Sequence, residues 1–152
     1  MTGMPDQDQA SSAAAEHSSP EVAALFAAAL AARARAYAPY SGFAVGAAVR
    51  DEAGRIHAGC NVENAAYPVG TCAEAGALAA MIAAGGARVQ AALVLGDGSA
   101  PVTPCGACRQ RLREFASPDT PVHVADPGGV RLTLTVAALL PASFGPDTLH
   151  AR

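Results

Sequence analysis

The sequence predicts an α/β fold in which a five-stranded mixed sheet lies between layers of helices, a three-layer α/β/α sandwich. The expected elements follow the order αββαβαββ, with no internal repeat and no linker. The run at 89–96 (VQAALVLG) is almost continuously apolar, which is typical of a strand buried on both faces. A chain of 152 residues, 51% of them hydrophobic, can build one core without staples. We therefore expect a single domain over residues 20–152, preceded by a disordered polar tail over residues 1–19.

The first helix is expected over residues 20–37. Ser19 is a capping residue, Pro20 suits the first helical position, and Glu21 places an acid in the first turn. The side chains expected on its buried face are Val22, Leu25, Phe26, Ala29 and Leu30. Pro39 ends the helix.

Strands are expected at 43–50 and 55–61, joined by a hairpin turn at 51–54. An irregular segment at 62–71 leads into a second helix at 72–84, which Gly85 and Gly86 close. After the strand at 89–96, a third helix is expected at 105–115. The last elements are strands at 121–125 and 130–134 around a turn at 126–129, and a short helix at 136–140.

Charge and hydropathy exclude several function classes. The net charge is −3 and the sequence has no basic run, whereas a protein that binds nucleic acid usually presents a basic face. No stretch approaches the roughly 20 apolar residues of a membrane span. The N-terminus has no secretory pattern, so we expect a cytoplasmic protein with reduced cysteines. In that setting, cysteine usage indicates metal binding or catalysis.

Cys105 and Cys108 form a Cys-x-x-Cys pair at the start of the third predicted helix. The unpaired N–H groups and positive dipole end of a helix favour thiolates, which are the form of cysteine that binds zinc. Taken alone, the pair is equally compatible with a redox dithiol, a closed structural zinc site or a catalytic zinc site.

Cys72 and Glu74 favour a catalytic zinc site. Cys72 stands at the start of the second predicted helix, and Glu74 follows two residues later. Three thiolates leave one tetrahedral position for water, and the combined pattern matches the signature of zinc deaminases, in which the Glu is not a ligand. Cys60, at a strand end, is expected to be a buried core thiol, with a fourth zinc ligand as the alternative.

The sequence resembles the small cytidine deaminase family from about residue 37 to residue 149. The motifs that carry the resemblance are YSGF at 40–43, GCNVENAAY at 59–67, CAE at 72–74, PCGACRQ at 104–110 and LLPASF at 139–144. The resemblance implies the fold described above, a homotetramer, and one Zn²⁺ per subunit. It implies hydrolytic deamination of cytidine or deoxycytidine in pyrimidine salvage, with a free nucleoside as the substrate.

The resemblance also assigns roles to residues. Cys72, Cys105 and Cys108 would be the zinc ligands, and Glu74 would be the catalytic proton shuttle. Asn61 and Glu63 would hold the ribose hydroxyls, and the backbone at Ala73 would bind the base. Phe43 and Tyr67 would line the nucleoside site, and Phe144 would reach the site of a neighbouring subunit. Without the resemblance, Phe43 is interpreted as a core strand residue, Phe144 as a C-terminal staple, and Asn61 and Glu63 as loop-capping groups.

One position departs from the family pattern. Many members place an Arg after Cys-Ala-Glu that hydrogen-bonds the thiolates, but this chain has Ala75. Zn²⁺ together with three thiolates has a net charge of about −1. We expect the two helix N-termini to offset it, with help from Arg109.

Two alternatives to a cytidine deaminase stay open at this point. One is a deaminase of another aminopyrimidine nucleoside, such as a blasticidin-type antibiotic, and the other is a non-catalytic zinc-binding protein. Asn61 with Glu63 favours a ribose-containing substrate, and Glu74 has no use in a purely structural site. A polynucleotide-editing deaminase would need a basic or aromatic channel, which a chain with 5% aromatic residues does not suggest.

Overall fold

The computed structural model describes residues 19–150, and the side chain of His150 is not described. The predicted disordered tail therefore lies outside the described residues, apart from Ser19. None of the helices in the described range is long and apolar enough to cross a membrane.

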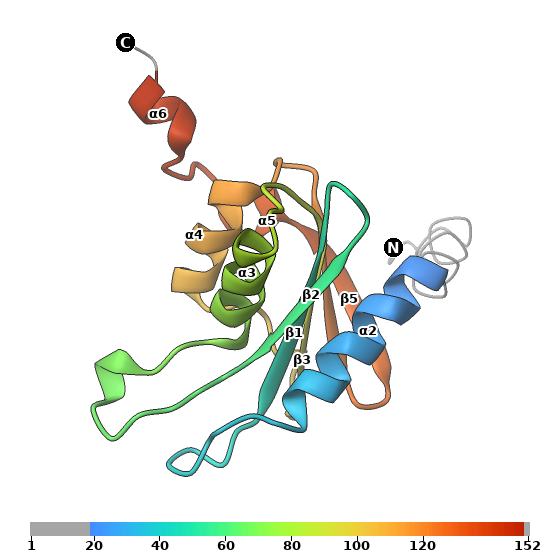
Figure 1. Cartoon of the computed structure of the whole chain (residues 1–152), viewed down its shortest axis with the longest axis vertical. Helices are drawn as coiled ribbons and strands as arrows, with labels where there is room; N and C mark the ends of the chain where they lie inside the picture. Colours follow the sequence, from blue (N-terminus) through green and yellow to red (C-terminus); the bar gives the residue numbers. More distant parts are fainter. Residues whose placement is uncertain (1–18, 151–152) are drawn as a thin grey trace, which may run out of the picture.

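A five-stranded mixed sheet forms the middle layer of the molecule (Figure 1). Its spatial order is β2-β1-β3-β4-β5, and only the β3–β4 pair is parallel. The strands are β1 (Val45–Asp51), β2 (Ile56–Cys60), β3 (Val89–Gly96), β4 (Pro121–Asp126) and β5 (Gly129–Thr135). The α/β prediction with a five-stranded mixed sheet is confirmed.

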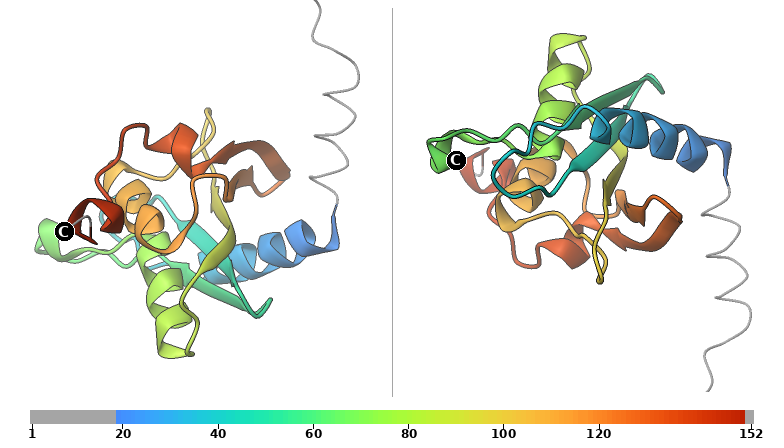
Figure 2. Two further views of the ribbon diagram at one scale, coloured as in Figure 1. Left: turned by 90° about the horizontal axis from the view of Figure 1, so that it is seen from above. Right: turned by 90° about the horizontal axis from the view of Figure 1, so that it is seen from below.

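Helices cover both faces of this sheet. Helix α2 (Pro20–Arg33) packs on one face, and α3 (Ala73–Ala83), α4 (Gly106–Phe115) and α5 (Val136–Leu139) pack on the other. Views from above and below show α2 and α3 on opposite sides of the strands (Figure 2). The three layers predicted from the sequence are therefore present.

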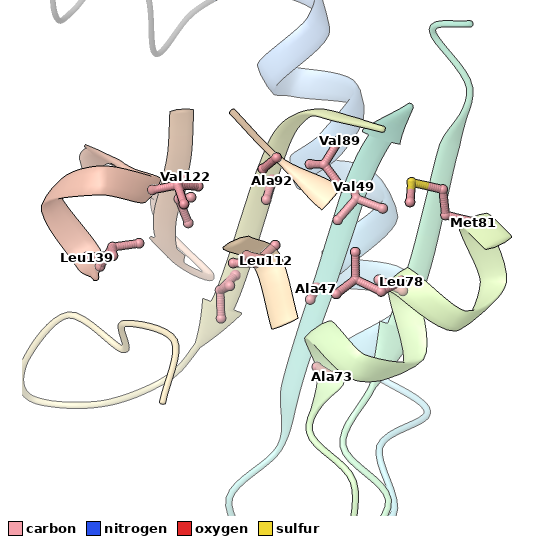
Figure 3. Packing of buried hydrophobic residues seen from close by; sticks show 14 residues of the cluster. Ala47, Val49, Ala73, Leu78, Met81, Val89, Ala92, Leu112, Val122 and Leu139 are labelled. Carbon is pink, nitrogen blue, oxygen red and sulfur yellow. The ribbon is translucent and has the colours of Figure 1, made fainter. Parts of the chain in front are cut away.

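The core consists of two clusters, one on each face of the sheet. Ala47 and Val49 of β1 face α3, whereas Ala48 between them faces α2, as the period of two in a strand requires. Strand β3 contributes to both clusters, which explains its continuous apolar sequence. Figure 3 shows Leu78 and Met81 of α3, Leu112 of α4 and Leu139 of α5 around the strands.

Helix α2 is shorter than predicted. Its N-terminus is as expected, with the Ser19 hydroxyl accepting a hydrogen bond from the Val22 N–H at 3.3 Å. It ends at Arg33 rather than at residue 37, because Tyr37 joins a bridge with Val62 and donates its N–H to the Asn61 carbonyl at 3.0 Å. The prediction that Leu30 is buried is wrong, since its side chain is 37% exposed.

The other boundaries agree with the prediction to within two residues, and two short helices were not predicted. Strand β1 begins at Val45 instead of residue 43, which leaves Phe43 outside the sheet. A 3-10 turn, η1 (Tyr67–Val69), lies in the segment expected to be irregular, and α6 (Pro146–His150) follows α5. Gly85 ends α3 in the left-handed conformation, with φ of 87°.

Helix α3 approaches β2 closely through a pair of glycines. A Cβ atom built on Gly76 would lie 3.4 Å from the Cα of Gly59. A Cβ atom on Gly59 would meet the Ala73 carbonyl oxygen at 2.5 Å and overlap the Ala77 nitrogen. The absence of side chains at these positions therefore sets the depth at which α3, with Cys72 and Glu74 at its start, lies on the sheet.

A buried carboxylate organises the β1–β2 hairpin. The Oδ1 atom of Asp51 accepts the backbone N–H groups of Ala53 and Arg55, both at 2.9 Å, and its Oδ2 lies 2.8 Å from Arg55 Nε and from His57 Nε2. Arg55 Nη1 also donates to the Ala84 carbonyl at 2.9 Å, which ties the hairpin to the end of α3. Burial by itself would raise the pKa of Asp51, but these hydrogen bonds lower it to about 2.

Replacing Gly59 with Ala is expected to lower the free energy of unfolding by about 1–3 kcal/mol, because the added methyl group overlaps backbone atoms that cannot rotate away. Urea unfolding of the metal-free protein, followed by circular dichroism, measures the effect. Gly106→Ala is the control, since a Cβ atom there meets no heavy atom within 4 Å. Equal losses in the two variants would contradict the close-approach argument.

The Asp51 network is expected to make stability depend on acid pH. A carboxyl whose pKa falls from 3.8 to about 2 on folding stabilises the folded state above about pH 4, and that contribution disappears as the pH falls toward 2. Asp51→Asn should therefore lower the melting temperature most near about pH 5, and the difference from the parent should shrink toward about pH 2.

Thermal unfolding of the metal-free proteins at several pH values tests this, because acid also releases zinc from thiolates. Asp119→Asn, at an exposed turn position, is the control and should show a small effect at all pH values. A constant difference between the parent and Asp51→Asn across this range would contradict the prediction.

Candidate metal centre and substrate cavity

The N-termini of α3 and α4 bring three cysteine sulfurs together. Cys72 is the N-cap of α3, Cys105 is the N-cap of α4, and Cys108 lies in the first turn of α4. The Sγ atoms of Cys72 and Cys105 are 3.8 Å apart, and all three sulfurs lie within 4.8 Å of one another. Sulfurs bound to one tetrahedral zinc at about 2.3 Å are separated by about 3.8 Å, so this donor set fits zinc.

The three thiols differ in their surroundings. Burial alone would raise the pKa of Cys105, but hydrogen bonds from the backbone N–H groups of Cys108 and Ala107 and from the other thiols lower it. Burial raises the pKa of Cys72 and, more strongly, that of Cys108, where the negative charge of Glu74 adds to the effect. A cation bound between the three sulfurs would offset the repulsion between their negative charges and so stabilise the thiolate forms.

Cys60 is not part of this cluster. It is free and half-buried at the end of β2, and among the described residues only Cys72, Cys105 and Cys108 form a group that could hold a metal ion. Cys60 was expected to be a buried core thiol and is only partly buried, and its alternative role as a fourth ligand finds no support. Three protein ligands leave one tetrahedral position for water or substrate, as in catalytic zinc sites.

Glu74 lies close enough to the cysteine sulfurs to act on them by its charge, and it lines a cavity. It is the second residue of α3, and its side chain is only 5% exposed. Its side chain lines the cavity, and none of the hydrogen bonds between described residues involves its carboxylate. A buried carboxylate without a protein partner is free to exchange a proton with a molecule in the cavity.

The cavity has a volume of about 650 Å³, which is in the range of small-molecule sites. Its wall contains Cys72, Cys105 and Glu74 together with residues from the segments before β1 and after β2. The predicted residues on this wall are Phe43, Asn61, Glu63, Tyr67, Cys72, Ala73, Glu74 and Cys105. Tyr40, Val45, Val102 and Thr103 also line it and were not predicted.

Asn61 and Glu63 line the cavity and fix the segment before β1. The side chain of Asn61 accepts the Val45 N–H and donates to the Phe43 carbonyl, both at 2.8 Å. The Oε1 atom of Glu63 accepts the N–H groups of Tyr40 at 3.0 Å and Ser41 at 3.2 Å. The Ser41 hydroxyl and these N–H groups lower the pKa of Glu63, so it is ionised at neutral pH.

The loop-capping interpretation of both residues is therefore confirmed. It leaves further acceptor capacity on the Glu63 carboxylate and one N–H of Asn61 for a ligand. Their role toward a ribose stays a prediction.

The aromatic residues divide into two groups. Phe43 and Tyr67 line the cavity, and the Tyr67 ring packs edge-on against Tyr40 with ring centroids 5.8 Å apart. The interpretation of Phe43 as a core strand residue is wrong, because it precedes β1 and is 40% exposed. Phe144 does not line the cavity of its own chain and is 58% exposed, while its carbonyl accepts a hydrogen bond from Gln110 at 3.0 Å.

A family model for the zinc-binding region of cytidine and deoxycytidylate deaminases matches residues 11–124. The chain belongs to this family. Cytidine deaminase of Sporosarcina psychrophila is 44% identical over 118 residues, which cover 78% of this chain and 87% of that protein. Cytidine deaminase of Mycobacterium tuberculosis H37Rv is 43% identical over 120 residues, covering 78% of this chain and 85% of that protein.

A solved structure gives the same result. The crystal structure of cytidine deaminase from Burkholderia pseudomallei has a TM-score of 0.75 and 45% sequence identity, and the match covers 80% of this chain and 98% of that one. The resemblance to small cytidine deaminases and the predicted zinc cofactor are both confirmed.

The arginines near the deaminase zinc site differ from the expectation. Arg109 does not contact a sulfur, because its guanidinium donates to the Pro104 carbonyl, the Thr103 hydroxyl and the Leu139 carbonyl. Arg111 instead places Nη1 3.7 Å from the Sγ of Cys108. Sequence reasoning missed this residue, although its position three residues after Cys108 on a predicted helix would have placed both on one face.

Proposed function

We propose that this chain catalyses the hydrolytic deamination of cytidine or deoxycytidine to uridine or deoxyuridine and ammonia, as in pyrimidine salvage. The observation that carries the proposal is the position of Glu74. Its buried side chain lies beside three cysteines that could hold a zinc ion and lines a cavity of about 650 Å³. The relatives named cytidine deaminase support the same reaction.

In the proposed mechanism, Cys72, Cys105 and Cys108 would hold zinc, which would supply the Lewis acid that makes water acidic enough to react at neutral pH. Glu74 accepts a proton from that water and delivers it to ring atom N3, while the oxygen forms a bond to C4. Glu74 then takes the remaining proton from the new C4 hydroxyl and transfers it to the exocyclic amine, so that the C4–N4 bond breaks, the C4 carbonyl forms and ammonia leaves. One carboxylate thus acts first as base and then as acid.

The nucleoside is proposed to lie with its base near Ala73 and its sugar near the mouth of the cavity. Glu63 and Asn61 offer an ionised oxygen and an N–H to the sugar hydroxyls, and their backbone hydrogen bonds keep these groups fixed. A substrate without the hydroxyls would leave them unpaired, which discriminates strongly against it. Phe43 and Tyr67 supply apolar surface to the bound nucleoside.

Replacing Glu74 with Gln is expected to lower the turnover of cytidine by at least about 10²-fold, because Gln cannot accept or transfer a proton. Zinc content should be unchanged, since Glu74 is not a ligand. Loss of ultraviolet absorbance on incubation with cytidine measures turnover. Glu114→Gln, an exposed position on α4, is the control and should act as the parent does.

Near-parental turnover by Glu74→Gln would show that the proton-transfer role is wrong. If the zinc-loaded parent deaminates neither cytidine nor deoxycytidine, the proposed substrate class is wrong.

We also propose a homotetramer in which Phe144 enters the cavity of a neighbouring subunit. Several apolar side chains on the segments that flank the cavity are exposed, among them Val62, Tyr67 and Val69. Exposed apolar clusters of this kind favour association. Gln110 and Arg113 of α4 hold the C-terminal segment through Phe144, Ser143 and Asp147, so Phe144 is presented outward from a fixed support.

Co-expression of Glu74→Gln with Phe144→Ala tests the shared site. Each variant alone should be weakly active. With equal and random mixing, about half of the sites carry Glu74 and about half of their neighbours carry Phe144, so about a quarter of the sites should have both residues intact. Sedimentation analysis gives the oligomeric state. Activity equal to the mean of the two separate variants would contradict a shared site.

A cytoplasmic location remains part of the proposal. All three ligand sulfurs belong to free cysteines, and a reducing compartment keeps them available for zinc.

A further inference from the structure

The metal centre has an excess of negative charge. Three thiolates around Zn²⁺ leave about one net negative charge, and Glu74 adds another beside it. The N-termini of α3 and α4 each contribute roughly half a positive charge at Cys72 and Cys105. Cys108 lies inside the first turn of α4 and is fully buried, so it has neither the N-cap position nor contact with solvent.

Arg111 is placed to serve Cys108. It lies one helical turn after Cys108 on α4, and its Nη1 atom is 3.7 Å from the Cys108 sulfur. Among the described residues, Arg111 has no carboxylate partner, whereas Arg33, Arg55, Arg113 and Arg131 each pair with an Asp. Arg109, which directly follows Cys108 in the sequence, instead donates hydrogen bonds from its guanidinium to oxygen atoms.

We propose that Arg111 is a positioning residue of the zinc site, which donates to the Cys108 thiolate and offsets the net negative charge of the metal centre. It takes the place that a cation at position 75 would fill on α3. Residue 75 follows Cys72 by three positions at the start of α3, as Arg111 follows Cys108 on α4. A small residue at position 75 is therefore compatible with tight zinc binding.

The inference rests on zinc binding by the three cysteines, and zinc affinity tests it without any turnover. Arg111→Met removes the donors and the charge but keeps an apolar stem of similar length. It is expected to weaken zinc binding by about 10–100-fold, the usual effect of removing a hydrogen-bond partner of a metal ligand. Competition for Zn²⁺ with a chromophoric chelator measures the dissociation constant. Failure of this inference would leave the proposed deamination untouched.

Arg88→Met is the matched control, because Arg88 is an exposed arginine before β3 and should leave the affinity at the parental value. Arg111→Lys keeps the charge and should retain most of the affinity. Urea unfolding of the metal-free variants separates zinc binding from packing, since Arg111 is exposed and its replacement should not change the stability of the metal-free protein.

A double variant tests whether a cation at position 75 can replace the cation of Arg111. Adding Ala75→Arg to Arg111→Met should restore zinc binding, because it returns a cation to the sulfurs from the other helix. Three results would overturn the proposal: parental affinity in Arg111→Met, an equal loss in Arg111→Lys, or no recovery in the double variant.

Discussion

The structure depends on the meeting of two helix N-termini at one point on one face of the sheet. Both α3 and α4 pack on the face opposite α2, and their first turns bring Cys72, Cys105 and Cys108 to within 4.8 Å. The N–H groups at these helix ends have no partners within the helices, and they favour the thiolate form of cysteine. The Gly59–Gly76 contact sets how deeply α3 lies on β2, so it fixes both a ligand and Glu74 relative to α4.

Two residues of the cavity wall, Asn61 and Glu63, also fix the loops that form it. The segments before β1 and after β2 have little regular structure. The side chains of Asn61 and Glu63 supply hydrogen bonds that backbone pairing would provide in a strand. Each of these polar groups fixes its loop and still faces the cavity with unused capacity. Loop-capping and substrate binding are therefore compatible functions of one side chain, because the first function gives the second its rigidity.

Much of the fold follows from local signals in the sequence. Strand β3 was predicted to the residue because it is buried on both faces, and α3 and α4 begin where their cysteine caps indicate. The end of α2 was misplaced because an Ala-rich sequence carries no stop signal before Pro39. The interruption comes from Tyr37, whose partner Val62 is distant in the chain. Helix α6 was missed because its ties to Arg113 are tertiary.

In the site, too, contacts that depend on tertiary structure were harder to predict than the motifs. The motifs predicted the residues of the metal cluster and part of the cavity wall. For the cluster this was possible because spacing at a helix start determines which side chains lie together. The motifs did not predict which arginine reaches a sulfur, since Arg109 and Arg111 lie two residues apart and point to different partners. Only the fold reveals that the carbonyls of Pro104 and Leu139 take the donors of Arg109.

Each ligand sulfur thus has its own source of positive potential. Cys72 has the N-terminus of α3, Cys105 has that of α4, and Cys108, which is buried beyond the helix cap, has the guanidinium of Arg111. The backbone N–H groups of Ala107 and Cys108 hydrogen-bond the Cys105 sulfur, so the start of α4 stabilises this capping thiolate more directly than the buried Cys108 sulfur in the same turn. The ligand in greatest need of a cation is the one that contacts Arg111, and for this reason position 75 can hold alanine in a catalytic site.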